Sequence, residues 1–97
     1  MKTHHQILHE SFSEDFVKKM KNRIVMSHHK YGSLKEAKQD IRYPRNEIKN
    51  AMYRINKYMN TGNTEYLVDA ANFLMFEFME MHGNFIATDG DPTDRII

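Results

Sequence analysis

The amino-acid sequence predicts an all-α protein, and three observations favour this fold class. Apolar residues recur at steps of three and four in three separate segments, which is the period of an amphipathic helix. No segment alternates strictly between polar and apolar residues, as a half-buried β-strand does. Gly32, Gly62 and Pro44 fall between the periodic segments, where glycine and proline commonly end or begin helices.

The first long helix is predicted to follow Ser11 and to end at Gly32. Ser11 and Glu14 have the spacing of a capping box, in which the serine oxygen accepts a hydrogen bond from the Glu14 amide. The basic cluster from Lys18 to Arg23 then falls on the solvent side of the helix. The apolar side consists of Phe16, Met20, Ile24 and Tyr31.

A second long helix is predicted to begin at Pro44, because proline is favoured in a first helical turn and restricts the residue before it. Between the two long helices, Ser33 and Glu36 are spaced as a capping box, so the segment SLKEAKQD fits a short fourth helix. The apolar stripe of the second long helix consists of Ile48, Met52, Ile55 and Met59.

The third long helix is predicted over Thr64 to His82, the longest uninterrupted helical pattern in the chain. Only a short connection around Gly62 separates it from the second helix, so the two are expected to pack antiparallel as the hairpin core of the fold. The stripe predicted to face the core consists of Leu67, Ala71, Leu74, Phe78 and Met81.

The length of 97 residues predicts a single all-α domain, residues 1–97, with one modest core. Residues 1–10 are expected to be loosely held, and residues 84–97, rich in Asp, Gly and Pro, to form a loop-like tail. Because so short a chain often completes its core by oligomerising, we expect the bundle to be a homo-oligomer.

The composition argues against several classes of protein. The chain contains no cysteine, which excludes disulfides, thiolate zinc sites and a cysteine nucleophile. The net charge of +1 gives no strong electrostatic footprint for nucleic acid. No apolar run approaches the roughly 18 residues of a membrane span, and MKTHHQILHE lacks the apolar core of a signal peptide. A cytoplasmic protein without a membrane partner is therefore expected.

A polar ladder of Glu65, Asp69 and Asn72 follows the third helix on the side opposite its apolar stripe. Two carboxylates one turn apart repel each other unless a cation, an arginine or a proton lies between them. With the Asn72 oxygen they offer an oxygen-rich surface suited to a hard cation such as magnesium, or to hydrogen bonds with a base or sugar. The alternative is a solvated acidic face near a helix N-terminus, where the helix dipole favours carboxylates.

A second candidate group lies at the end of the first helix, where the sequence is HHKYG. Lys30 can meet a phosphate, and the Tyr31 ring can stack on a base. In the alternative interpretation Tyr31 belongs to the apolar core stripe, and the cations only cap the helix C-terminus. His5 and His9 are spaced for a metal on one helical face, but no third ligand is near them in the sequence.

Three stretches resemble one known group of proteins: HKYG, RINKYMNTGNTEYLVDAANF and the ATDGD motif in the tail. They look like short phage-borne proteins of the MazG-like, all-α nucleoside triphosphate pyrophosphohydrolases, over about two thirds of the chain. The resemblance implies a helical bundle in which carboxylates hold magnesium. The metal activates water, which splits a nucleoside triphosphate between its alpha and beta phosphates. A homodimer or homotetramer in the cytoplasm of the host cell is the expected assembly.

Carried over to this sequence, Asp69 matches the aspartate of the second acidic motif of the family. Glu65 resembles its upstream glutamate, although it lies four residues away where the family commonly has three. In place of the first motif, E-E-x-x-E, the chain has Glu47 followed by Asn50 and Arg54. The resemblance therefore implies magnesium ligands at Glu47, Glu65 and Asp69, with catalysis by Glu65 and Asp69. Substrate contacts are implied at Lys30, Tyr31 and Asn72.

Two other functions are compatible with the sequence. A phage accessory protein without catalytic activity would bind and modulate a host protein through an exposed helix face. Nucleic-acid binding through the basic cluster from Lys18 to Arg23 is a third option, although no motif of a known DNA-binding module accompanies that cluster. The substrate preference and the identity of any host partner cannot be inferred from the residues.

Overall fold

The computed structural model describes residues 1–35, 45–80 and 83–87. This part of the chain contains four α-helices and no β-strand, which confirms the predicted all-α class and the three long helices. The helices are α1 (His4–Ser11), α2 (Glu14–Tyr31), α4 (Glu47–Thr61) and α5 (Glu65–Glu80).

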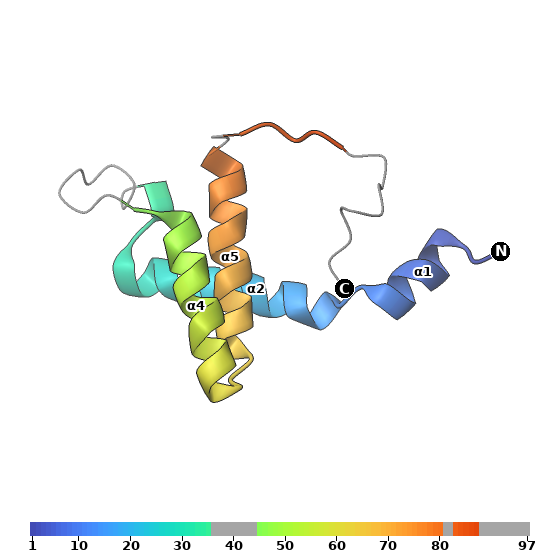
Figure 1. Ribbon diagram of the computed structural model, residues 1–97, viewed down its shortest axis with the longest axis horizontal. Coiled ribbons are helices and arrows are strands. Elements are labelled where there is room, and N and C mark those ends of the chain that lie inside the picture. The colour runs from blue at the N-terminus through green and yellow to red at the C-terminus, as the bar shows by residue number, and fades with distance from the viewer. Residues whose placement is uncertain (36–44, 81–82, 88–97) are drawn as a thin grey trace.

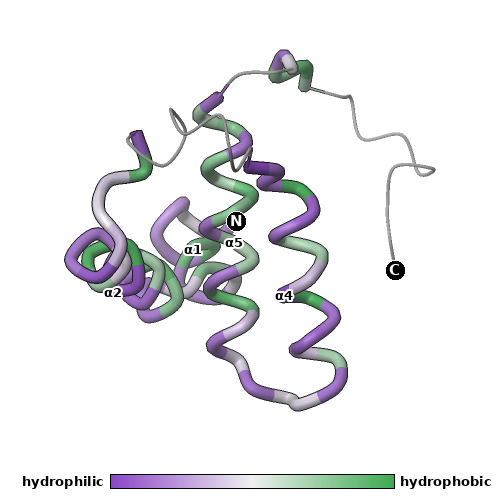
Figure 2. Tube along the Cα trace, turned by 90° about the vertical axis from the view of Figure 1, so that its left-hand side faces the viewer, coloured by the Kyte–Doolittle hydropathy of each residue, from purple (hydrophilic) through white to green (hydrophobic). Residues whose placement is uncertain are grey.

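Helices α4 and α5 lie side by side and antiparallel, as Figure 1 shows, and they form the predicted hairpin. Helix α2 crosses behind them and packs on α5 (Figure 1). In Figure 2, α2 and α4 lie on opposite sides of α5. Helix α1 extends away from the other helices at one end of the molecule (Figure 1). The arrangement makes α5 the central helix, in contact with both α2 and α4.

The first two helices begin differently from the prediction. Ser11 is the last residue of α1, so it does not cap the first long helix. Ser13 caps α2 instead, with its hydroxyl oxygen accepting a hydrogen bond from the Phe16 amide at 3.0 Å. Residues 1–10 were expected to be loosely held, but Thr3 and Gln6 form a capping box that starts α1. Local capping chemistry therefore organises a segment that has no buried residue.

Helix α4 begins at Glu47, with the Asn46 side chain accepting a hydrogen bond from the Lys49 amide at 2.9 Å. The start predicted at Pro44, and most of the short helix predicted from Ser33 onward, lie outside the described residues. Helix α4 ends at Gly62, where φ is 71° and the glycine amide donates to the Tyr58 carbonyl oxygen at 2.7 Å. This left-handed C-cap lets the chain reverse direction within a few residues.

The hairpin buries a different side of each helix from the one predicted. Helix α4 turns Glu47 and Ala51 inward and leaves its apolar stripe exposed. Helix α5 buries Val68, Ala70 and Asn72, the last of which belongs to the polar ladder. It leaves Leu74 and Phe78 exposed. Within the described residues, the buried apolar side chains are Ala51, Val68 and Ala70. The prediction was wrong because it assigned each apolar stripe to the interior of a single chain.

Polar and aromatic groups connect the two helices of the hairpin. The Arg54 guanidinium of α4 lies 5.6 Å from the Phe73 ring centroid of α5 and 5.4 Å from the Tyr53 ring. The Lys57 ammonium lies 5.8 Å from the Tyr66 ring of α5. Contacts of this geometry are cation–π interactions, each contributing on the order of 0.5–1 kcal/mol at partly exposed sites. None of the described helices is both long and apolar enough to cross a membrane.

We predict that Gly62→Ala lowers the free energy of unfolding by about 1–2 kcal/mol, because alanine is strained in the left-handed region. An added Cβ at Gly62 meets no atom within 4 Å, so backbone strain is the expected cause. Gly83→Ala is the control, since an added Cβ is equally free there and φ is not in that region. Urea unfolding of both variants provides the measurement, and equal effects would contradict the prediction.

Candidate functional site

Arg23 of α2 binds both carboxylates of the predicted polar ladder. Its Nε donates to Asp69 Oδ1 at 3.0 Å, and its Nη2 donates to Asp69 Oδ2 at 3.3 Å. The same Nη2 lies 2.9 Å from Glu65 Oε1. A cation, an arginine or a proton can make such a carboxylate pair favourable. In this structure the group is an arginine.

We call Arg23, Glu65 and Asp69 the Arg23 cluster. It is partly buried at the contact between α2 and α5. The Asp69 side chain is 16% exposed, that of Arg23 35% and that of Glu65 48%. The hydrogen bond to Asp69 raises the pKa of the Arg23 guanidinium above its ordinary value, and the charges of Asp69 and Glu65 raise it further against the opposing effect of burial. The guanidinium therefore remains charged, and it holds α2 against α5 through charge-assisted hydrogen bonds.

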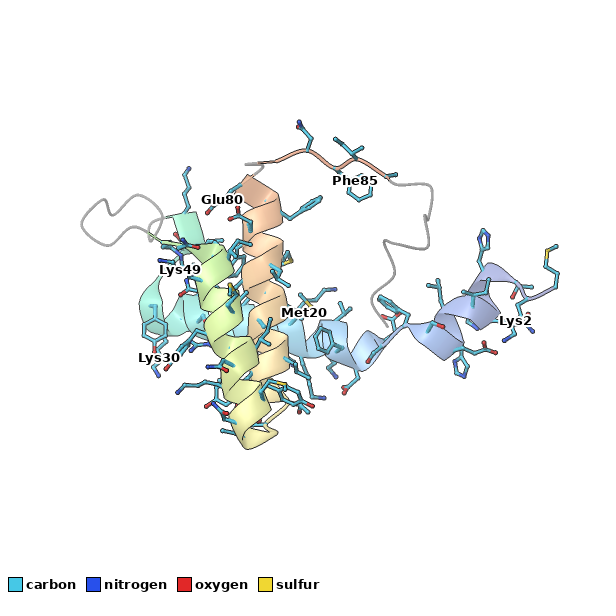
Figure 3. All side chains as sticks on the ribbon, viewed as in Figure 1. Lys2, Met20, Lys30, Lys49, Glu80 and Phe85 are labelled. Carbon is cyan, nitrogen blue, oxygen red and sulfur yellow. The ribbon has the colours of Figure 1, made fainter. Side chains whose placement is uncertain are left out.

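Asn72, the third member of the ladder, is 5% exposed. Its Nδ2 donates a hydrogen bond to the Met20 carbonyl oxygen at 3.0 Å, and Figure 3 labels Met20 where α2 crosses α5. Its Oδ1 is buried and has no hydrogen-bond partner in the described part of the chain. Asn72 thus contributes to helix docking, and the predicted contact with a base or sugar would require the two helices to separate.

Glu47 lies at the start of α4, where its side chain is 1% exposed. The Arg45 Nε lies 2.7 Å from its Oε1, so this carboxylate is also bound by an arginine. Among the described residues, no group of three or more His, Asp or Glu side chains is placed to hold a metal ion. The magnesium site of Glu47, Glu65 and Asp69 stays a prediction, and a metal there would have to displace the arginines.

A hollow of about 330 Å³ adjoins the Arg23 cluster, between α2 and the start of α5. This volume is at the lower end of the range for small-molecule sites, roughly 300–1,000 Å³. Its lining brings cations, amides, a hydroxyl and a carboxylate together around one small apolar residue. The lining residues are Lys19, Asn22, Arg23, Asn63, Thr64, Glu65 and Val68.

Lys30 and Tyr31 lie at the end of α2, two turns beyond Arg23. The Lys30 ammonium is 5.2 Å from the Tyr31 ring centroid, and Tyr31 is 73% exposed. The alternative that placed Tyr31 in the apolar core is therefore wrong.

Sequence reasoning missed the role of Arg23 and assigned it to a solvent-facing basic cluster. The residue is separated from Asp69 by 46 positions, so no local spacing connects them. The available signal was the pair Glu65 and Asp69 itself, because two carboxylates one turn apart become favourable when a cation, an arginine or a proton lies between them. Comparison with models of known protein families, with curated proteins and with solved structures found no match to this chain.

We predict that Arg23→Met lowers the free energy of unfolding by about 1–2 kcal/mol, because it leaves two carboxylates without their hydrogen-bond donor. Lys19→Met is the matched control on the same helix. Lys19 pairs with Asp15 at the surface, where both side chains are more than half exposed, and water screens that pair. The hydrogen bond from Lys19 lowers the pKa of Asp15.

Thermal unfolding of the two variants with and without magnesium makes the comparison. A lower unfolding temperature for Arg23→Met alone, unaffected by magnesium, supports a structural role for the arginine. Full recovery of Arg23→Met by magnesium would show that the two carboxylates are metal ligands instead.

Proposed function

We propose that this protein binds a nucleotide in the hollow between α2 and the start of α5. The observation that supports the proposal is a guanidinium, Arg23, which is one-third exposed at this hollow and shares it with Lys19. Arginine and lysine are the side chains best suited to phosphate oxygens, and guanidinium binds them through two parallel hydrogen bonds. The resemblance of the HKYG and DAANF stretches to MazG-like proteins favours a nucleotide over other phosphate compounds.

The proposed orientation places the phosphates at Arg23 and Lys19 and the base toward Tyr31. Tyr31 follows Arg23 by eight residues on α2, which is about 12 Å along a helix at 1.5 Å per residue. An exposed aromatic ring offers a stacking surface for a base, and Lys30 beside it adds a second cation. Asn72 takes no part in this orientation, because it is buried between the helices.

Hydrolysis is a further step of the proposal. Phosphate oxygens compete with the carboxylates for the Arg23 donors, so a bound triphosphate would release Glu65, which is already 48% exposed. Glu65 and Asp69 would then hold magnesium against the phosphates. Water would add to the alpha phosphorus, the bond to the bridging oxygen would break, and diphosphate would leave. With Glu47 held by Arg45, two of the three carboxylates that the resemblance implies, Glu65 and Asp69, remain for the metal.

Thermal unfolding with nucleoside triphosphates and magnesium tests binding, and release of diphosphate in the same samples tests hydrolysis. A nucleotide at about 100 times its Kd adds about 2.7 kcal/mol of stability, which corresponds to a rise in Tm of roughly 10 °C or more for a chain of this size. A shift without diphosphate leaves a nucleotide-binding protein without catalysis. No shift with any ribo- or deoxynucleotide contradicts the proposal.

Two substitutions at exposed residues localise the site without disturbing the fold. We predict that Lys19→Met and Tyr31→Ala each weaken nucleotide binding while leaving the Tm of the free protein unchanged. Lys21→Met, an exposed substitution on the same helix outside the hollow, is the control and is expected to bind normally. If Lys21→Met weakens binding as much as Lys19→Met, the affinity arises from the general charge of α2 and the hollow is not the site.

A second candidate function is a non-enzymatic accessory protein that binds another protein, and α1 favours it. This helix extends away from the other helices (Figure 1). Its Ile7 and Leu8 are 47% and 57% exposed. An exposed amphipathic helix is one recurring means of docking into a groove of a partner. The double substitution Ile7→Ser and Leu8→Ser is expected to leave Tm unchanged and to abolish cross-links between α1 and a partner in cells. His5→Ser on the same helix is the control and is expected to keep these cross-links. If the double variant keeps them as well, this function is contradicted.

A further inference from the structure

One face of the α4–α5 hairpin is apolar and open to solvent. We call it the open apolar face. Its six large side chains are between 42% and 74% exposed. They are Ile48, Met52, Ile55 and Met59 of α4 and Leu74 and Phe78 of α5.

The two stripes lie on the same side of the hairpin. On α5, at 100° per residue, Leu74 and Phe78 point away from the side that carries Glu65 and Asp69, which α2 covers. On α4, the exposed stripe lies about 90° from the Glu47 and Ala51 side, which packs on α5. Because the helices are antiparallel, both rotations bring the stripes to the face opposite α2. The open apolar face is therefore two helices wide.

The amount of exposed apolar surface is close to that required by a stable dimer. A large apolar side chain that is about half exposed leaves on the order of 100 Å² in water, so six of them leave roughly 600 Å². A standard protein interface covers about 800 Å² on each partner. A shallow hollow on α4, lined by Met52, Ile55 and Met59 among others, adds concave surface for a side chain of the partner.

The single chain has little apolar core without this face. In the described residues, the buried apolar side chains are one valine and two alanines. Such a core is small for a chain of 97 residues, and oligomerisation is one way in which proteins supplement a small core. The partner must then be present whenever the chain is folded, and a second copy of the same chain always is.

We propose that the open apolar face binds a second copy of this chain, so that two hairpins pack into a four-helix bundle. In a two-fold dimer the same patch is used by both subunits, so a charged side chain on the patch would be buried against apolar side chains of the partner. Neither stripe contains a charged residue, which suits self-association. Helix α2 and the Arg23 cluster lie on the other side of α5, so the dimer does not depend on the proposed nucleotide site.

The purified full-length chain, without other proteins, provides the test. Light scattering coupled to size-exclusion chromatography is expected to give twice the mass of one chain at micromolar concentrations. Met52→Lys is expected to lose the dimer, because it buries a charge in the interface, whereas Met52 is 63% exposed in the single chain. Asn60→Lys places the same charge at an exposed position of α4 outside the open apolar face and is expected to stay dimeric.

Each outcome decides the proposal. If Met52→Lys becomes monomeric, or loses its helical circular dichroism while Asn60→Lys does not, the proposal is supported, since a lysine at an exposed site of a monomer has no reason to unfold it. A wild-type chain that is monomeric and unfolds at a temperature independent of concentration overturns it. The occupant would then be another protein or the apolar residues Phe85 and Ile86 of this chain. A Met52→Lys variant that remains dimeric also overturns it.

Discussion

The rest of the structure depends on the bridge that Arg23 makes between Glu65 and Asp69. One guanidinium on α2 binds two carboxylates on successive turns of α5, and Asn72 adds a hydrogen bond to the Met20 carbonyl oxygen one turn further along. Together these contacts decide that α2 covers the polar side of α5. The apolar side of α5 is left to solvent as a direct consequence.

Arginines bind the carboxylates that the resemblance implies as magnesium ligands. Arg23 binds Glu65 and Asp69, and Arg45 binds the buried Glu47. A paired, partly buried carboxylate needs no metal to offset its desolvation, because the guanidinium already provides charge and donors. Glu65 and Asp69, which suggest a hydrolase in the sequence, therefore act as docking contacts between α2 and α5 in the free protein, whereas Glu47 pairs locally with Arg45. Any metal chemistry must begin with the displacement of an arginine.

The hairpin has two faces of different character. On one, α2 and the start of α5 enclose a polar hollow with Arg23 and Lys19 at its edge. On the other, large apolar side chains are exposed over two helices. Because these faces lie on opposite sides of α5, a ligand on the first and a subunit on the second would not compete. Among the described residues, the buried apolar core between the two faces consists of Ala51, Val68 and Ala70, so contacts at either face would add to a small core.

The sequence by itself determined the long helices of this protein and their hairpin, but not α1. Helical periodicity located the three long helices, and Gly62 with its short loop determined the antiparallel hairpin, because these signals act within a few residues. It also identified Glu65 and Asp69 as a pair of like charges that a cation, an arginine or a proton would stabilise, with a solvated acidic face as the alternative. Only the tertiary structure decided that the partner is Arg23, and which side of each helix is buried. Helical periodicity separates a polar side of a helix from an apolar side, but it does not say which side is buried. That choice depends on contacts between residues far apart in the sequence, such as Arg23 and Asp69, which are 46 positions apart.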